Sequence, residues 1–210
     1  MSTSTTVLLV LVALLGFWAV GAYNRLTRLR GAAISAWGPL DAQLRRRQAL
    51  AIELAERLAP QPAMDDEVGR ATIETLTAAT RQAQAATDHA QVRPTRAGAI
   101  QSLGLAEGVL DGALRPLAVL IEARPQLLDD PDAGAHLRGL LESLRDCDAQ
   151  LAFARRLFND AVRAFNAAVD ELPTCLLAGV YGFKPAATLQ SASPDRGPDS
   201  QIASSFGERL

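Results

Sequence analysis

The chain has 210 residues, and its 21 Lys and Arg residues nearly balance its 23 Asp and Glu residues. The net charge of −2 gives no overall positive field that would favour nucleic acid. Runs of β-branched residues that favour strands are absent after the N-terminal segment, whereas Ala and Leu, which favour helices, are frequent. The composition therefore predicts an all-α protein without a nucleic-acid partner.

The N-terminal segment predicts a membrane anchor. Residues 7–22 form an unbroken apolar run, VLLVLVALLGFWAVGA, and the first charged side chain is that of Arg25. As a helix the run spans roughly 24 Å, and uncharged flanking residues extend it to the ~30 Å of a hydrocarbon core. A cleavable signal peptide, for which residues 19–22 offer small side chains, would begin with a basic segment that MSTSTT lacks. A buried core helix does not account for a terminal run that is apolar on every face. We therefore predict an uncleaved anchor over residues 1–23.

Three arginines, Arg25, Arg28 and Arg30, follow the apolar run, and no basic side chain precedes it. Because positively charged flanks stay on the cytoplasmic side, this asymmetry predicts a single-pass protein of the inner (cytoplasmic) membrane with its N-terminus outside. Residues 24–184 then form a cytoplasmic helical bundle. Residues 185–210, rich in Ser, Pro, Gly and Asp, are predicted to be a disordered tail.

The first predicted helix continues from the anchor to about Leu58, where Pro60 and Pro62 follow. Its apolar residues recur at steps of three and four, as on one face of a helix. These residues are Leu26, Leu29, Ala33, Trp37, Leu40 and Leu44. Pro39 removes the hydrogen bond to the Ser35 carbonyl, so we predict a kink there.

Two shorter helices are predicted next. The second runs from near Met64 to about Gln91, and the acidic residues 65–67 suit the positive end of its dipole. The third runs from about Thr95 to Ala123 and has a clear apolar stripe, although three glycines and Pro116 weaken it. The stripe consists of Leu103, Leu110, Leu114, Leu117 and Ile121. Residues 127–130 are predicted to be a connector.

The fourth predicted helix, which begins at Pro131 and ends at Pro173, has a sustained heptad pattern. One seam consists of Leu137, Leu144, Leu151, Phe158, Phe165 and Leu172. The second seam consists of Leu140, Cys147, Ala154, Ala161 and Ala168. This spacing predicts near-antiparallel, coiled-coil-like packing in a four-helix bundle, with Phe165 buried.

Several short stretches occur in the order found in one known family. They are Tyr23-Asn24-Arg25-Leu26 with Leu29-Arg30, Ala36-Trp37, Asp41-Ala42-Gln43-Leu44-Arg45-Arg46-Arg47, Glu122-Ala123-Arg124-Pro125-Gln126-Leu127, Ala154-Arg155-Arg156-Leu157-Phe158-Asn159, Phe165-Asn166, Leu172-Pro173 and Gly182-Phe183. Over nearly all of residues 7–184, the chain resembles the LemA family. The resemblance implies a membrane-anchored antiparallel helical bundle and no established catalytic activity. Gly38-Pro39 and Phe158 depart from the pattern of the family.

No catalytic, cofactor-binding or metal-binding residues are predicted. His89 and His136 have no companions at ligand spacing, and Cys147 and Cys175 lie too far apart for a zinc motif. No Ser/His/Asp arrangement, glycine-rich phosphate loop or carboxylate pair is apparent, and Asp148 does not share a helix face with Asp146. The sequence therefore predicts no cofactor and no small-molecule substrate.

Polar residues in three places are interpreted structurally. Consecutive Arg45, Arg46 and Arg47 could bind phosphate or anionic lipid, but they spread around the helix, so we interpret them as a solvated turn. For Asn24, Asn159 and Asn166 we expect structural hydrogen bonds, because a buried amide must be satisfied.

An apolar segment follows the fourth helix. Short connectors make successive helices antiparallel, so this segment is predicted to lie at the membrane end of the bundle. Its residues could cap the core or could contact the bilayer or a membrane partner, since aromatic rings favour headgroups. The candidate contact residues are Leu176, Leu177, Val180, Tyr181, Phe183 and Lys184.

Two functional hypotheses follow. Because no reactive constellation is apparent, we expect a membrane-anchored interaction, scaffold or adaptor protein, not an enzyme, whose partners are the lipid bilayer and an unidentified membrane protein. The alternative is an enzyme with an unrecognised site between helices. A cluster of titratable residues in one pocket would favour the enzyme, and a core of only Leu, Ala and Phe would oppose it.

Overall fold

The computed structural model describes residues 3–171, 175, 181 and 183–190. Within these residues the chain forms five α-helices and one 3-10 helix, and no strand. The helices are α1 (Thr3–Leu58), η1 (Pro62–Met64), α2 (Glu67–Val92), α3 (Ala97–Glu122), α4 (Gln126–Asp129) and α5 (Ala133–Asp170). The predicted all-α class is confirmed.

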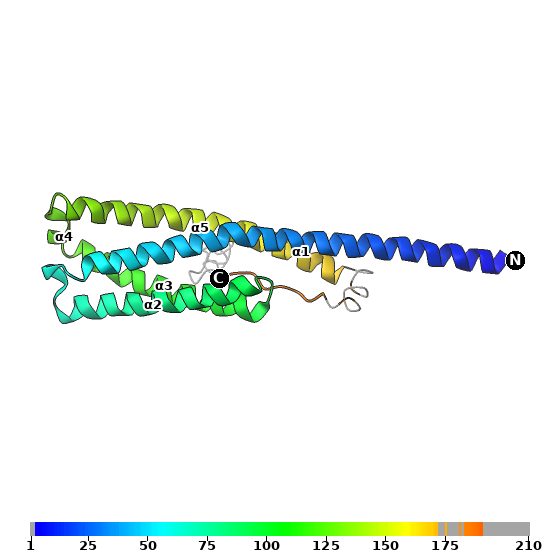
Figure 1. Ribbon diagram of the computed structural model, residues 1–210, viewed down its shortest axis with the longest axis horizontal. Coiled ribbons are helices and arrows are strands. Elements are labelled where there is room, and N and C mark those ends of the chain that lie inside the picture. Colours follow the sequence, from blue (N-terminus) through cyan, green and yellow to red (C-terminus); the bar gives the residue numbers. More distant parts are fainter. Residues whose placement is uncertain (1–2, 172–174, 176–180, 182, 191–210) are drawn as a thin grey trace, which may run out of the picture.

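The four long helices form an elongated antiparallel bundle, from which the N-terminal part of α1 extends alone (Figure 1). The helix α1 packs most extensively against α5, and α2 packs against α3. A further contact joins α1 to α2, whereas the backbones of α3 and α5 scarcely approach each other. The bundle is therefore open along the side between α3 and α5.

The predicted helix boundaries agree with the structure to within a few residues, with one exception. Residues 127–130, predicted to be a connector, include most of the short helix α4. The helix α5 begins at Ala133, where the Asp130 carboxylate accepts hydrogen bonds from the backbone N–H groups of Asp132 (2.9 Å) and Ala133 (2.6 Å). Such a side-chain cap satisfies N–H groups that have no partner within the helix.

Neither internal proline interrupts its helix. The helix α1 continues through Pro39, and α3 continues through Pro116. Figure 1 shows α1 as one continuous helix with only a gentle bend and without the sharp kink predicted at Pro39.

The heptad pattern of α5 faces the core. The side chains of Leu137, Leu151, Phe158 and Phe165 are buried, whereas Leu144 is half-buried. The sixth member of the seam, Leu172, lies outside the described residues. Phe165 is 2% exposed, which confirms its predicted burial.

A layer of polar side chains divides the core into two apolar clusters. One cluster, nearer the N-terminus of α1, includes Trp37 and Phe158, whose rings meet edge to face at 5.7 Å. The other cluster lies toward the far end of the bundle. Between them, Arg47, Gln48 and Glu107 are buried at 5%, 1% and 3% exposure. The core is therefore not made of Leu, Ala and Phe alone.

Residues 185–190 differ from the predicted disordered tail. Ala186 and Leu189 are buried and belong to the same cluster as Phe158. Asn166 and Asn159 on α5 hydrogen-bond to their backbones. The prediction was wrong for residues 185–190 because two buried apolar side chains and two amides hold this segment on the open side of the bundle. The remainder of the predicted tail, 191–210, lies outside the described residues.

Candidate functional site

The N-terminal part of α1 exposes an apolar surface on all sides. Between residues 7 and 20, the large aliphatic side chains and Phe17 are each more than half exposed, with Phe17 at 81%. This helix is long and apolar enough to cross a membrane. A contiguous apolar surface of this size is unfavourable in water and marks a membrane or protein contact.

The bundle begins where this apolar helix ends. Ala22 is the first buried residue of α1, and Leu26 is fully buried. The ring of Tyr23, between them, lies 5.1 Å from that of Tyr181 and 6.1 Å from that of Phe183, measured between ring centroids. The segment that follows α5 thus returns to the base of the projecting helix.

An ion pair joins α1 to the end of α5 near the projecting helix. The Arg25 guanidinium lies 2.6 Å from the Glu171 carboxylate. Both side chains are about half exposed, so we expect the pair to add little to stability. Its position shows that α1 and α5 stay side by side to the last turn of α5.

The predicted contact residues divide into two groups. Tyr181 is 53% exposed and Lys184 is exposed, whereas Phe183 is half-buried and its ring lies 6.3 Å from that of Phe165. Phe183 therefore extends the core, and Tyr181 and Lys184 face outward. Leu176, Leu177 and Val180 lie outside the described residues.

The three consecutive arginines point to three different surroundings. Arg45 pairs with Asp41 (3.0 Å) and Asp88 (2.9 Å), and Arg46 donates a hydrogen bond to Gln150 (3.3 Å). Arg47 points into the core. The predicted spread around the helix is correct, but the interpretation as a solvated turn was wrong for Arg47.

Arg47 joins three carboxylates from two other helices. Its Nη1 donates to Glu107 Oε2 on α3 (2.9 Å), and its Nε lies 2.8 Å from Asp148 Oδ1 on α5. Its Nη2 pairs with Asp111, also on α3. Neither Glu107 nor Asp148 was predicted to have a role. One guanidinium thus links α1, α3 and α5 across the open side of the bundle.

Gln48 extends this polar layer to α2. Its Nε2 donates to Thr87 Oγ1 on α2 (2.8 Å) and approaches Glu107 Oε1 (3.4 Å). The Thr87 hydroxyl in turn donates to the Ala83 carbonyl (2.9 Å). Together, Arg47, Gln48, Thr87, Glu107, Asp111 and Asp148 form what we call the polar layer, which contacts all four long helices.

Burial opposes ionisation within the polar layer. It raises the pKa of Glu107, although the Arg47 charge and hydrogen bonds from Arg47 and Gln48 act in the opposite direction. Burial likewise raises the pKa of Asp148. For Arg47, burial acts to lower the pKa, but the charges of Asp111 and Asp148 outweigh it and keep the guanidinium charged. Desolvated charges persist only when paired in this way.

A groove of about 410 Å³ opens beside the polar layer, between α3 and α5. Four arginines line it, together with Asp111, Asp148 and apolar side chains such as Leu114 and Leu144. The arginines are Arg47, Arg115, Arg145 and Arg155. The pKa of Arg155 is lowered by burial, and the charges of nearby carboxylates only partly offset this effect. The lining of the groove thus combines apolar side chains with four basic and two acidic ones.

The cysteines and histidines form no reactive group with these residues. The Cys147 thiol is buried, and burial raises its pKa, so it stays protonated. His136 pairs with Glu53 at the surface (3.2 Å), and His89 is exposed. Among residues 3–171, 175, 181 and 183–190, no three His, Cys, Asp or Glu side chains are placed to hold a metal ion.

Two residues of the polar layer, Arg47 and Glu107, occupy positions within apolar stripes of the sequence. Arg47 continues the spacing of Leu40 and Leu44 on α1, and Glu107 lies between Leu103 and Leu110 on α3. A charged residue inside an apolar stripe predicts a buried partner of opposite charge, because an unpaired buried charge is too costly. The neighbouring Arg45 and Arg46 obscure this signal, because a run of consecutive arginines resembles a solvated turn.

The comparisons with known proteins agree with this architecture. The family model described as the LemA family matches residues 36–202. The match begins after the projecting part of α1, includes the polar layer, and continues past Gln190. The comparison with curated proteins gave no match.

Proposed function

The chain belongs to the LemA family, and we propose that it is a membrane-anchored interaction or adaptor protein. The single observation that supports this role is the projecting, exposed apolar part of α1, which continues directly into the bundle. One rigid helix that serves as both anchor and bundle member holds the bundle at the membrane surface. Such a protein offers its helix faces to partners in or near the same membrane.

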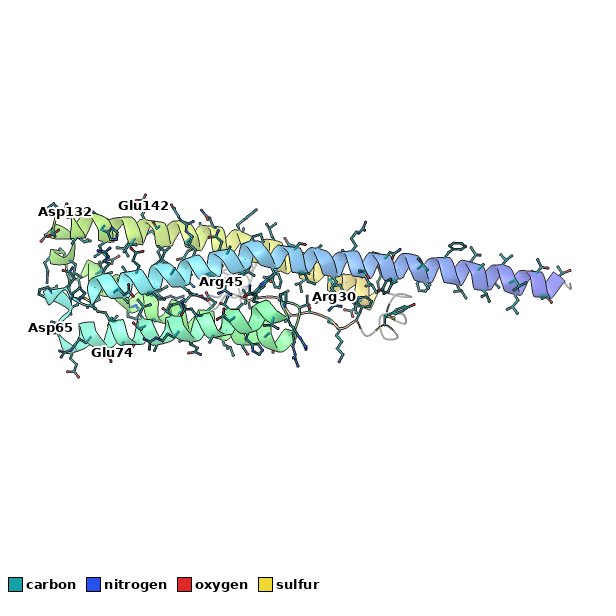
Figure 2. All side chains as sticks on the ribbon, viewed as in Figure 1. Arg30, Arg45, Asp65, Glu74, Asp132 and Glu142 are labelled. Atoms are coloured by element: carbon teal, nitrogen blue, oxygen red, sulfur yellow. The ribbon has the colours of Figure 1, made fainter. Side chains whose placement is uncertain are left out.

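The orientation that we propose follows from charge. Arg25, Arg28 and Arg30 follow the apolar part of α1, and Figure 2 shows Arg30 where α1 runs beside the end of α5. The positive-inside rule then favours a cytoplasmic bundle and an N-terminus outside the inner membrane. In this orientation Tyr181, which lies beside Tyr23, and the exposed Lys184 would lie at headgroup depth, where an aromatic ring and a basic side chain are favoured.

The bundle also has a surface suited to a protein partner. On α5, Phe153 is 64% exposed and Leu157 is 47% exposed. They are four residues apart and therefore adjacent on one helix face. Exposed aromatic and aliphatic side chains of this kind are common anchors in protein interfaces. We propose that this face contacts the partner.

Photocrosslinking tests the adaptor role. A benzoylphenylalanine residue replaces Phe153 in the full-length protein, and intact membranes are irradiated. We expect one discrete adduct that contains another membrane protein, identified by mass spectrometry. The matched control carries the same residue at Arg163, which is exposed on the same helix. Absence of an adduct at Phe153, or equal adducts at both positions, would contradict the proposed face.

The polar layer is the one observation that favours an enzyme. It brings several titratable residues to one groove, which was the feature expected of an enzyme. However, all three carboxylates pair with Arg47, and the neighbouring Cys147 thiol is buried and has a raised pKa. Among the described residues, no group of His, Cys, Asp and Glu side chains is placed to hold a metal ion. Paired charges that link helices serve as structural contacts, so we propose that the chain is not an enzyme.

A further inference from the structure

Two asparagines of α5 bind the backbone of the segment that follows the bundle. Asn166 Nδ2 donates to the Ala186 carbonyl (2.8 Å), and the Ala186 N–H donates to Asn166 Oδ1 (2.8 Å). Asn159 makes the same pair of bonds with Leu189, at 2.9 and 2.8 Å. Each side-chain amide therefore pairs with the N–H and C=O of one residue, as a neighbouring β-strand would.

The spacing of these two pairs defines a register. Leu189 lies three positions after Ala186, and Asn166 lies seven positions after Asn159. Three residues of extended chain advance roughly 10 Å, and seven residues of α-helix advance roughly 10.5 Å. The segment therefore runs antiparallel to α5. Each advance of three residues along the segment brings it to the α5 residue seven positions earlier in the sequence, on the same helix face.

The open side of the bundle accepts this segment. Residues 186–188 and Gln190 line a groove with Gly104 and Gly108 of α3. The Leu189 side chain lies 3.6 Å from the position of a Cβ added to Gly104. A chain that continued from Gln190 in the same direction would reach the arginine-lined groove beside the polar layer. The next two positions in the heptad register, Ala152 and Arg145, both line that groove.

We propose that the arginine-lined groove between α3 and α5 is the docking site of this chain's own residues 191–199. The register places Ala192 at Ala152 and Asp195 at Arg145. A small residue opposite another small residue allows close approach, and Asp195 meets a guanidinium that has no ion-pair partner among the described residues. Arg115 and Arg155 add positive charge to the same groove.

Two further observations support this occupant. Residues 191–199 contain two aspartates, Asp195 and Asp199, and one arginine, so they complement a basic groove. The family match continues to residue 202, so this segment lies within the region that the family model covers. The docked segment would cover the side of the polar layer on which Asp148 is still partly exposed.

Limited proteolysis of the full-length protein in detergent micelles tests the proposal. Trypsin cleaves after Arg196, within the proposed docked segment. Because protection reflects how rarely the segment is released, we expect cleavage at least about tenfold slower than in a free peptide of residues 187–210. Cleavage at the rate of the free peptide would overturn the proposal.

Matched charge variants identify the groove as the cause of protection. Arg115→Glu with Arg145→Glu should restore cleavage at Arg196 to near the rate of the free peptide. Arg81→Glu with Arg163→Glu makes the same charge change at exposed positions outside the groove and should preserve protection. Far-UV circular dichroism checks that both variants keep their helicity. Protection that survives the groove variant would also overturn the proposal.

Cysteine pairs test the register in a background with Cys147→Ala and Cys175→Ser. Asp195→Cys with Arg145→Cys should form a disulfide within one chain on mild oxidation. Asp195→Cys with Arg138→Cys, one heptad further along α5, should form it much more slowly, because disulfides require close Cα atoms. Equal rates would refute the register, and disulfides only between chains would assign the groove to a second copy.

Discussion

Arg47→Met should lower the free energy of unfolding by about 3–5 kcal/mol, because it leaves the buried carboxylate of Glu107 without its cation. Arg47 is 5% exposed and pairs with Glu107 (2.9 Å) and Asp148 (2.8 Å). Methionine keeps most of the side-chain length, so the loss reflects the charge more than a cavity. Chemical denaturation of the full-length protein in detergent, followed by far-UV circular dichroism, measures the change.

Arg45→Met is the matched control, since Arg45 lies two residues away on the same helix. Its side chain is 41% exposed, and its pairs with Asp41 and Asp88 are accessible to water. Exposed ion pairs contribute about 0–1 kcal/mol, so this variant should lose no more than that. Equal stability of the two variants would show that Arg47 does not hold a buried network.

A second variant separates pairing from packing. Adding Glu107→Leu to Arg47→Met removes both members of the most buried pair, each of which is at most 5% exposed. Replacing a buried pair with apolar side chains is often neutral or stabilising, whereas removing one member is costly. The double variant should therefore be more stable than Arg47→Met alone. A double variant that is less stable would indicate that lost packing dominates.

Phe165→Ala should lower the free energy of unfolding by about 3–5 kcal/mol through the cavity that it leaves. Phe165 is 2% exposed, and its ring lies 6.3 Å from that of Phe183. The substitution therefore removes packing within the bundle and also support for the segment beside the anchor. The same denaturation experiment measures it.

Phe153→Ala provides the control for this prediction on the same helix. Phe153 is 64% exposed, so its truncation should change stability by less than about 0.5 kcal/mol. A similar loss in both variants would contradict the assignment of the buried seam of α5. A loss only in Phe165→Ala would support that seam and leave Phe153 available to a partner.

The helices were predictable because their signals are local. The heptad spacing of Phe158 and Phe165 on α5, and the three-and-four spacing around Leu40 on α1, repeat often enough to outweigh Pro39. Proline costs one hydrogen bond and a steric contact, whereas the buried stripe of a long helix contributes at every turn. The short helix α4 was missed because four residues carry too little periodicity.

The polar layer and the position of residues 185–190 depend on contacts between distant parts of the chain. Arg47 and Glu107 are 60 residues apart, and their pairing requires knowledge of which helices are neighbours. Residues 185–190 have the composition of a disordered tail, yet Asn159 and Asn166 satisfy their backbone. Composition describes what a segment can bury by itself, and it does not describe the groove that receives it.

Cysteine labelling tests most directly the proposal that α1 anchors a cytoplasmic bundle. In the background with Cys147→Ala and Cys175→Ser, one variant carries Ser2→Cys and the other carries Ser205→Cys. A membrane-impermeant maleimide is applied to whole cells and, separately, to lysed cells. We expect Ser2→Cys to be labelled in whole cells and Ser205→Cys to be labelled only after lysis. Labelling of Ser205→Cys in whole cells, or protection of both positions until lysis, would contradict the proposed anchor and orientation.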